Sequence, residues 1–430
     1  MRCTAGVPAA SLPPPPLIPE VGVIALVPDR WHWQWQQRHQ VMTRLAHFFH
    51  VVWMNPAENW RRSMSFRKLL TRRVEAPVPE AGFRVYTPSP LLPEFYSPPW
   101  LAEFSLSKRL ENARRLLLNR GCEKVVLYLW RPEFAPALDA VRFDCSCYHI
   151  DDEYSFSAVE VPIPEQEARL IARVDQVFIH SPTMFAKKGN INPRTSLAPN
   201  GVDFDAYARP IPEPVDLANV PHPRIGYCGH VKKQLDLPLL VNLAAAHPEW
   251  SFVLVGSVTP HPAIVADTKK LSLMSNVHFL GGKTARELAA YPQHFDVCLM
   301  PYRRDDYTKY IYPLKLHEYL ASGRPTVGTL IPSLEPFRHV LGLPEKADQW
   351  AAAIREALSE AANSRTSRET RQTLARQHDW EILVRNIAKT LAQRLGPPFP
   401  DYLENRPPRE RQVENTGSSQ VRRPGISENE

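Results

Sequence analysis

Residues 295–329 read FDVCLMPYRRDDYTKYIYPLKLHEYLASGRPTVGT, and this stretch decides the fold. Its apolar beginning, residues 295–300, and the segment 325–327 are each typical of a strand in a buried parallel sheet. A helix is expected between them, because Pro313 suits the first position of a helix and Gly323 suits its end. Open parallel sheets bind ligands at the loop beyond the carboxyl end of such a strand, so this unit predicts a binding site.

Three polar residues of the expected helix, Lys315, Glu318 and Ser322, are spaced so that they share one face. A cation and a carboxylate beside a helix N-terminus suit a nucleotide. The cation and free N–H groups can meet phosphates, and the carboxylate can accept hydrogen bonds from ribose hydroxyls. A solvated helix face with an ion pair explains the same spacing equally well.

Residues 313–325, PLKLHEYLASGRP, resemble the PxKxxEYLAxGxPVV segment of retaining two-domain (GT-B) glycosyltransferases, especially those that build bacterial surface polysaccharides. The resemblance implies that Glu318 binds the ribose of a nucleotide sugar. It also implies that residues at the helix start, Leu314 and Lys315, hold the diphosphate. Many members carry a second glutamate where this chain has Tyr310, so the usual contact to the donor sugar is altered here.

The fold expected from these patterns is α/β, with two doubly wound, Rossmann-like domains that face a cleft, as in the GT-B class. A chain of 430 residues is long enough for each domain to bury its own core. The predicted division is a disordered leader at 1–19, an acceptor-side domain at 20–205, a proline-rich linker at 206–223, a nucleotide-sugar domain at 224–375, a crossing helix at 376–395 and a disordered tail at 396–430.

The composition narrows the class of partner. A formal charge of +7 favours anionic partners, and no nucleic-acid motif is visible, so nucleic acid is not expected. No apolar run approaches the roughly eighteen residues of a membrane span, and the proline-rich N-terminus does not suit a signal peptide, so a cytoplasmic location is expected. The six cysteines show no CxxC spacing and no flanked DxD is present, so neither a metal nor another cofactor is expected.

In the first domain, residues 143–154 (FDCSCYHIDDEY) are expected to form a strand that delivers His149, Asp151 and Asp152 at its carboxyl end. A histidine and two acids at a strand end can deprotonate or orient an acceptor hydroxyl, or they can cap the following helix. The resemblance favours the first interpretation, because a YDxxDDY segment at this place faces the interdomain cleft in the same group of transferases.

In the second domain, the predicted strand at 224–228 is followed by Gly229 and the turn HVKK. Glycine lets the backbone approach a phosphate, and Lys232 or Lys233 can neutralise it, although two lysines in a turn are also common on solvated surfaces. The resemblance implies basic residues here for the donor diphosphate, and an arginine near the position of Arg303.

Residues 60–73, WRRSMSFRKLLTRR, combine six arginines or lysines with apolar side chains, which is typical of a basic helix at a membrane interface. A solvated helix edge or a mobile loop fits the same composition. If the acceptor is lipid-linked, contact with an anionic membrane is expected here.

Taken with the resemblance, the sequence predicts transfer of a sugar from a nucleotide-diphosphate sugar to a saccharide or lipid-linked acceptor, with retention of configuration, in cell-surface glycan synthesis. Two alternatives stay open. One is a nucleotide-sugar epimerase of the same architecture. The other is a non-catalytic nucleotide-binding scaffold, which the tyrosine at position 310 makes worth testing.

Overall fold

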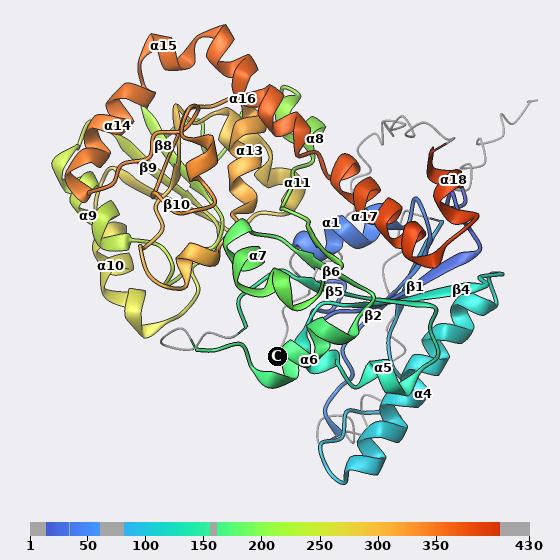
Figure 1. The fold of residues 1–430 in the computed structure, drawn as a ribbon. Coiled ribbons are helices and arrows are strands. Elements are labelled where there is room, and N and C mark those ends of the chain that lie inside the picture. Colours follow the sequence, from blue (N-terminus) through green and yellow to red (C-terminus); the bar gives the residue numbers. More distant parts are fainter. Residues whose placement is uncertain (1–13, 34, 61–80, 155–160, 405–430) are drawn as a thin grey trace, which may run out of the picture.

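The computed structural model describes residues 14–33, 35–60, 81–154 and 161–404, which form two parallel-sheet α/β domains (Figure 1). Within these residues, no helix is both long and apolar enough to cross a membrane. The two sheets carry helices on their faces, as the patterns of the sequence predict. The fold class expected from the sequence is therefore confirmed.

The described part of the first domain holds a seven-stranded parallel sheet in the order β3-β2-β1-β4-β5-β6-β7. The strands are β1 Val21–Leu26, β2 His50–Met54, β3 Phe83–Tyr86, β4 Lys124–Leu129, β5 Cys145–Ile150, β6 Gln176–Ile179 and β7 Thr195–Leu197. The helices are α1 Gln37–Leu45, α4 Pro99–Leu118, α5 Ala137–Ala140, α6 Glu165–Arg173 and α7 Pro182–Lys188, with 3₁₀ turns at Pro132–Phe134 and Gly189–Ile191. All residues of β1, β2 and β5 are buried, because helices cover both faces of the sheet.

The second domain is built around a five-stranded parallel sheet, described in the order β10-β9-β8-β11-β12. Its strands are β8 Arg224–Cys228, β9 Ser251–Val255, β10 Val277–Gly281, β11 Val297–Met300 and β12 Thr326–Gly328. Its helices are α9 Leu237–Ala246, α10 Pro262–Ser272, α11 Ala285–Leu288, α12 Ala290–Gln293, α13 Leu314–Ser322, α14 Trp350–Ala357, α15 Glu360–Asn363 and α16 Arg365–Gln377, with 3₁₀ turns at Thr308–Tyr310, Glu335–Phe337 and Ala347–Gln349. Strands β11 and β12 pair directly, so the loop and helix between them lie at the edge where ligands bind in such sheets.

Helix α13 ends at Gly323 with a φ of 73°, in the left-handed region that favours glycine. Its start differs by one position from the prediction, because Pro313 is the capping residue and Leu314 is the first helical residue. Ser322, which the helical spacing places on the same face as Lys315 and Glu318, is buried, and its hydroxyl donates to the carbonyl oxygen of Tyr319.

The chain passes between the domains twice, once through residues 200–204 and α8 (Phe204–Ala208), and again where α16 leads into α17 (Trp380–Leu395). The two passages lie side by side: the Val202 N–H donates to the His378 carbonyl oxygen at 3.0 Å, and the Trp380 N–H donates to the Val202 carbonyl oxygen at 3.0 Å. Helix α17 then runs back over the first domain and packs against α1 (Figure 1). Its buried face belongs to the same core as strand β1.

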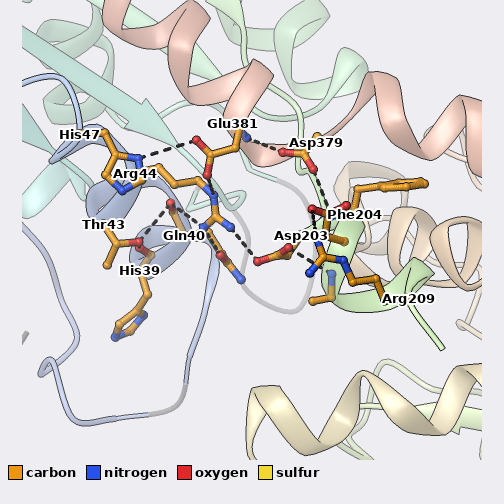
Figure 2. Close-up of polar contacts among 12 residues, drawn as sticks. His39, Gln40, Thr43, Arg44, His47, Asp203, Phe204, Arg209, Asp379 and Glu381 are labelled. Atoms are coloured by element: carbon orange, nitrogen blue, oxygen red, sulfur yellow. Dashed lines mark hydrogen bonds and ion pairs between the residues drawn. The ribbon is translucent and has the colours of Figure 1, made fainter. Parts of the chain in front are cut away.

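Arg44 of α1 ties both passages to the first domain (Figure 2). Its guanidinium is 3.0 Å from a carboxylate oxygen of Asp203 in the first passage and 3.0 Å from one of Glu381 at the start of α17. Asp379 adds a further link, since one of its carboxylate oxygens accepts from the Phe204 N–H at 3.1 Å. Gly201 lies within this junction, and a Cβ atom there would be 2.5 Å from the His378 carbonyl oxygen.

Two segments that the sequence analysis expected to be disordered are partly folded. At the N-terminal side, Ile18 is completely buried and its N–H donates to the Phe48 carbonyl oxygen at 2.8 Å. At the C-terminal side, α18 (Phe399–Glu404) places Phe399 and Leu403 in the core of the first domain. Isolated apolar side chains in polar, proline-bearing segments carried too weak a signal to predict this packing. The rest of both segments, 1–13 and 405–430, and residues 61–80 lie outside the described residues.

The close approach at Gly201 predicts a stability effect. Gly201→Ala would force the two passages apart, and we expect a loss of about 1–3 kcal/mol of unfolding free energy and a lower Tm in calorimetry. Gly282→Ala is the matched control, because the nearest atom to its Cβ position is 3.8 Å away. Equal Tm values for the two variants would contradict a tightly packed junction.

Candidate functional site

The carboxyl ends of strands from both sheets meet at the interdomain cleft. From the first domain, β5 delivers the residues that follow Ile150. From the second, β8 leads to the turn after Cys228, and β11 leads to the loop before α13. The two sides are in direct contact, because the Tyr307 hydroxyl donates to a carboxylate oxygen of Asp152 at 3.0 Å. The end of β5 and the loop before α13 therefore border a common region.

Lys315, in the first turn of α13, lies beneath Gly229. A Cβ atom on Gly229 would be 2.8 Å from the lysine Nζ, and Gly229 has a φ of 134°, so only glycine fits this approach. The Lys315 amine hydrogen-bonds the Tyr227 hydroxyl and lies 5.0 Å from the centroid of that ring. Burial opposes its charge, but Tyr227, Tyr302 and Glu318 outweigh burial and raise the pKa of Lys315, so the amine is protonated.

Lys232 is a second cation in the same region. Burial lowers the pKa of Lys232, and repulsion from Lys315 lowers it further, while Asp152 opposes the shift. Two amines that repel each other through a low-dielectric region gain stability when an anion lies between or beside them. Lys233, the other candidate of the turn, is exposed. The turn therefore presents Lys232 and not Lys233 to this region.

Glu318 lies on the same face of α13 as Lys315 and accepts a hydrogen bond from the hydroxyl of Tyr207 in α8. Burial raises the pKa of Glu318, while Lys315 and Tyr207 act in the opposite direction. A half-buried carboxylate next to a cation pair has the chemistry to accept hydrogen bonds from neighbouring hydroxyls. Tyr207 was not foreseen from the sequence, because it lies more than a hundred positions from Glu318.

The remaining donor-side candidates, Leu314 and Arg303, make their contacts elsewhere than the two amines. Leu314 is half-buried and packs against the core of the first domain, so its side chain belongs to the interdomain contact. The Arg303 Nε donates to the Leu235 carbonyl oxygen at 3.3 Å. Arg303 borders a pocket of about 470 Å³ whose lining residues include neither Lys232 nor Lys315.

Tyr310, at the position where the resemblance implies a glutamate in many similar chains, is buried in the core of the first domain. The amines of Lys187 and Lys309 each lie 5.1 Å from the centroid of its ring. Lys187 belongs to α7 of the first domain, so the ring bridges the two domains. At this position the chain has an anchor between domains in place of an acidic side chain.

Two of the three acceptor-side candidates are engaged within the first domain. His149 is buried, stacks on Trp130 with ring centroids 4.2 Å apart, and its Nδ1 is 2.7 Å from the Tyr128 hydroxyl. Burial lowers the pKa of His149 to about 3, so its ring is neutral near pH 7. Asp151 accepts from Arg38 at 2.7 Å and from the Tyr154 hydroxyl.

The pKa of Asp151 reflects that pairing. Burial favours its neutral form, but Arg38 and the Tyr154 hydrogen bond outweigh burial and lower the pKa of Asp151. It is therefore an ionised carboxylate held by fixed partners. Asp152 differs: it is half-buried, accepts from Tyr307 of the other domain, and acts electrostatically on Lys232. Of the three candidates, Asp152 is the one that faces the second domain.

Several residues of this region carried no usable signal in the sequence. Tyr227, Tyr302 and Tyr307 come from separate loops and strand ends, and only the fold brings them to the cation pair or to Asp152. Arg38 lies in α1, more than a hundred positions before its partner Asp151. No group of three or more His, Cys, Asp or Glu side chains within the described residues is placed to hold a metal ion.

Comparison with solved structures identifies the architecture. The chain has the GT-B fold. It aligns with the crystal structure of Anabaena Alr3699/HepE in complex with UDP and glucose with a TM-score of 0.60 at 16% identity, over 86% of this chain and 99% of the other. It aligns with an alpha,alpha-trehalose-phosphate synthase (UDP-forming) from Burkholderia vietnamiensis with a TM-score of 0.59 at 14% identity, over 87% and 97%. A glycosyltransferase from Rickettsia africae ESF-5 gives 0.60 at 11% identity, over 88% and 100%.

Sequence comparisons point to the same group of proteins. Residues 222–360, which span the second sheet and α13, match the family model described as Glycosyl transferases group 1. A protein of Bacillus subtilis (strain 168), named as the teichuronic acid biosynthesis glycosyltransferase TuaH, is 27% identical over 237 residues. That match covers 53% of this chain and 59% of the relative's length.

Removal of each carboxylate in turn tests whether Asp151 stabilises the first domain and Asp152 does not. Asp151→Asn removes the more buried of the two carboxylates that balance the Arg38 guanidinium, Asp29 being the other, and we expect a loss of about 3 kcal/mol in unfolding free energy. Asp152→Asn, at a half-buried position, is expected to cost no more than about 1 kcal/mol. Chemical denaturation of both variants measures this. A larger loss for Asp152→Asn would show that the roles are reversed.

Proposed function

We propose that this protein transfers a sugar from a nucleotide-diphosphate sugar to a saccharide or lipid-linked acceptor. The observation that carries the proposal is the pair of partly desolvated amines of Lys315, which lies beneath Gly229 and beside the Glu318 carboxylate, and Lys232, whose pKa the charge of Lys315 lowers. A diphosphate supplies the negative charge that this pair lacks, and a ribose supplies hydroxyls for Glu318. The match of residues 222–360 to a glycosyltransferase family supports the same assignment.

The proposed chemistry follows from where charge develops. The acceptor oxygen forms a bond to the anomeric carbon of the sugar while the bond from that carbon to the phosphate oxygen breaks, and the electron pair leaves with the diphosphate. Fixed cations beside the leaving group stabilise the growing charge and lower the barrier. Asp152, on the opposite wall, orients the acceptor hydroxyl, whose proton passes to the leaving phosphate or to this carboxylate.

The stereochemistry, the pathway and the donor sugar are inferred from similar proteins. We infer that the reaction retains the configuration of the anomeric carbon, as the resemblance of residues 313–325 implies. We also place it in cell-surface polysaccharide synthesis, since TuaH is named for teichuronic acid biosynthesis. The relative HepE was solved with UDP and glucose, so UDP-glucose is the first donor to test.

The cation pair predicts how nucleotide binding responds to mutation and pH. Lys232→Met should weaken UDP binding roughly tenfold or more, and Lys233→Met, at the exposed neighbour, should have little effect. Because the pKa of Lys232 is lowered, its charge is lost at a lower pH than that of an ordinary lysine. UDP affinity in calorimetry should therefore fall with rising alkaline pH in the wild type, and the Lys232→Met variant should lose much of this dependence.

The Glu318 carboxylate supplies a control on the same ligand. Glu318→Ala should weaken binding of UDP, and it should affect a ribose-free ligand such as pyrophosphate much less. Unchanged UDP affinity in Glu318→Ala and Lys232→Met would refute this site.

A non-catalytic scaffold is the second candidate, because a buried tyrosine occupies position 310. Thermal shift against UDP, GDP, ADP and TDP sugars, followed by acceptor-free hydrolysis of the sugar that stabilises most, separates the candidates. Binding without turnover, with or without acceptors, would favour the scaffold. Conversion of the sugar nucleotide to an isomer without an acceptor would favour an epimerase.

We further infer that the first domain makes peripheral contact with an anionic bilayer. Helix α4 exposes Trp100 and Phe104 one turn apart, with 67% and 52% of each side chain accessible. Aromatic side chains favour the membrane interface. The basic segment at 61–73 leaves the described chain at Trp60, whose N–H donates to the Glu94 carbonyl oxygen a few residues before this helix. Aromatic insertion and attraction of the basic segment to anionic lipid would act together.

This contact predicts lipid-dependent sedimentation. Vesicles containing phosphatidylglycerol should pellet the protein, and pure phosphatidylcholine vesicles should pellet much less. Replacing both Trp100 and Phe104 by Ser should reduce the bound fraction severalfold. Leu273→Ser, at a 78% exposed apolar residue of the second domain, is the control and should not. Equal pelleting with both lipids would rule out the proposed contact.

A further inference from the structure

Arg131 is a cation at the carboxyl edge of the first sheet that the donor site does not use. It follows strand β4 and the buried Trp130, next to the strand that delivers Asp151 and Asp152. Its guanidinium carbon lies 4.5 Å from the centroid of the Tyr154 ring. Tyr154 in turn donates a hydrogen bond to Asp151. Arg131 therefore belongs to the acceptor wall of the cleft.

Arg38 and Arg131 on this wall differ in their ion pairs. Arg38, the other arginine here, pairs with the carboxylates of Asp29 and Asp151. Within the part of the chain that the structure describes, Arg131 makes no ion pair with a carboxylate, and its Nε is buried without a hydrogen-bond partner. Stacking on an aromatic ring uses only the face of a guanidinium, so the terminal N–H groups of Arg131 stay available in its plane.

Arg131 also lies near the boundary between the domains. Its charge acts on both Tyr154 and Tyr307, and it lowers the pKa of each hydroxyl against the larger effect of burial. Tyr307 belongs to the second domain and donates to Asp152. The guanidinium thus lies near the contact between Tyr307 and Asp152, the carboxylate that we assign to the acceptor hydroxyl.

A planar guanidinium with free in-plane donors recognises carboxylates and phosphates through paired hydrogen bonds. We propose that Arg131 binds a carboxylate or phosphate group of the acceptor, so that the protein selects anionic over neutral acceptors. This inference rests on the proposed transferase function. It makes Arg131 a specificity-determining residue, separate from the cations that hold the donor diphosphate.

A merely structural role for Arg131 predicts something different. If the residue only supports the Tyr154 ring, its replacement lowers stability and reduces the use of all acceptors alike. If it binds an anion, its replacement removes the advantage of charged acceptors and leaves the use of neutral ones in place. The comparison of matched acceptors therefore separates the two roles.

The first experiment uses UDP-glucose as donor and measures UDP release with glucuronic acid, glucose 6-phosphate or glucose, after subtraction of acceptor-free hydrolysis. We expect kcat/KM at least tenfold higher for at least one of the charged acceptors than for glucose. Arg131→Gln should abolish that difference while acceptor-free hydrolysis persists. Arg169→Gln, at an exposed arginine of α6 in the same domain, should retain the wild-type preference.

The two charged acceptors distinguish a carboxylate from a phosphate as the recognised group. Equal use of all three acceptors by the wild type, or an equal loss for all three in Arg131→Gln, overturns the inference.

Calorimetric binding of glucose 6-phosphate and glucuronate, without donor, tests Arg131 even when no turnover occurs. Wild-type binding that weakens at least tenfold in Arg131→Gln supports the inference. Undetectable or unchanged binding, in the absence of acceptor preference, overturns it. Failure of the proposed function shows separately, as the absence of both nucleotide binding and UDP release with every acceptor.

Discussion

The architecture depends on one junction, where the chain passes twice between the domains and Arg44 holds both passages. Backbone hydrogen bonds join residue 202 to residues 378 and 380, and the guanidinium bridges Asp203 and Glu381. A single passage would be one linker, about which the two domains could rotate relative to each other. Joined together, they fix the direction in which the carboxyl edges of the two sheets face each other, and the close approach at Gly201 leaves little room for adjustment.

The donor side of the cleft is dominated by the cost of placing amines near each other in a poorly solvated region. Burial and mutual repulsion both act on Lys232, and no carboxylate pairs with it in an ion pair among the described residues. Such an arrangement raises the free energy of the protein without a ligand, and binding of an anion offsets this cost. Glu318, held by Tyr207 from the linking helix, adds an acceptor of hydrogen bonds beside the cations.

On the proposed acceptor side, in contrast to the proposed donor side, most charged side chains have partners within the protein. Most of its charges are neutralised internally, as Asp151 is by Arg38, and its histidine is kept neutral by burial. Among the described residues on this side, we assign two polar groups to a ligand: Asp152, which accepts from Tyr307, and the stacked guanidinium of Arg131. Tyr310 adds to the contact between the domains, because its buried ring lies between the amines of Lys187 and Lys309.

Local patterns in the sequence determined the two parallel sheets, the helix after Pro313 and the shared face of Lys315 and Glu318, because burial and helical spacing act between near neighbours. The sequence did not predict that residues 14–19 and 396–404 are folded. Only the tertiary structure selected Lys232 over Lys233, paired Arg38 with Asp151, and brought Tyr207, Tyr307 and Arg131 to the cleft. Those decisions join residues far apart in the chain, and a side chain's partner across a domain boundary leaves no periodic trace in the sequence.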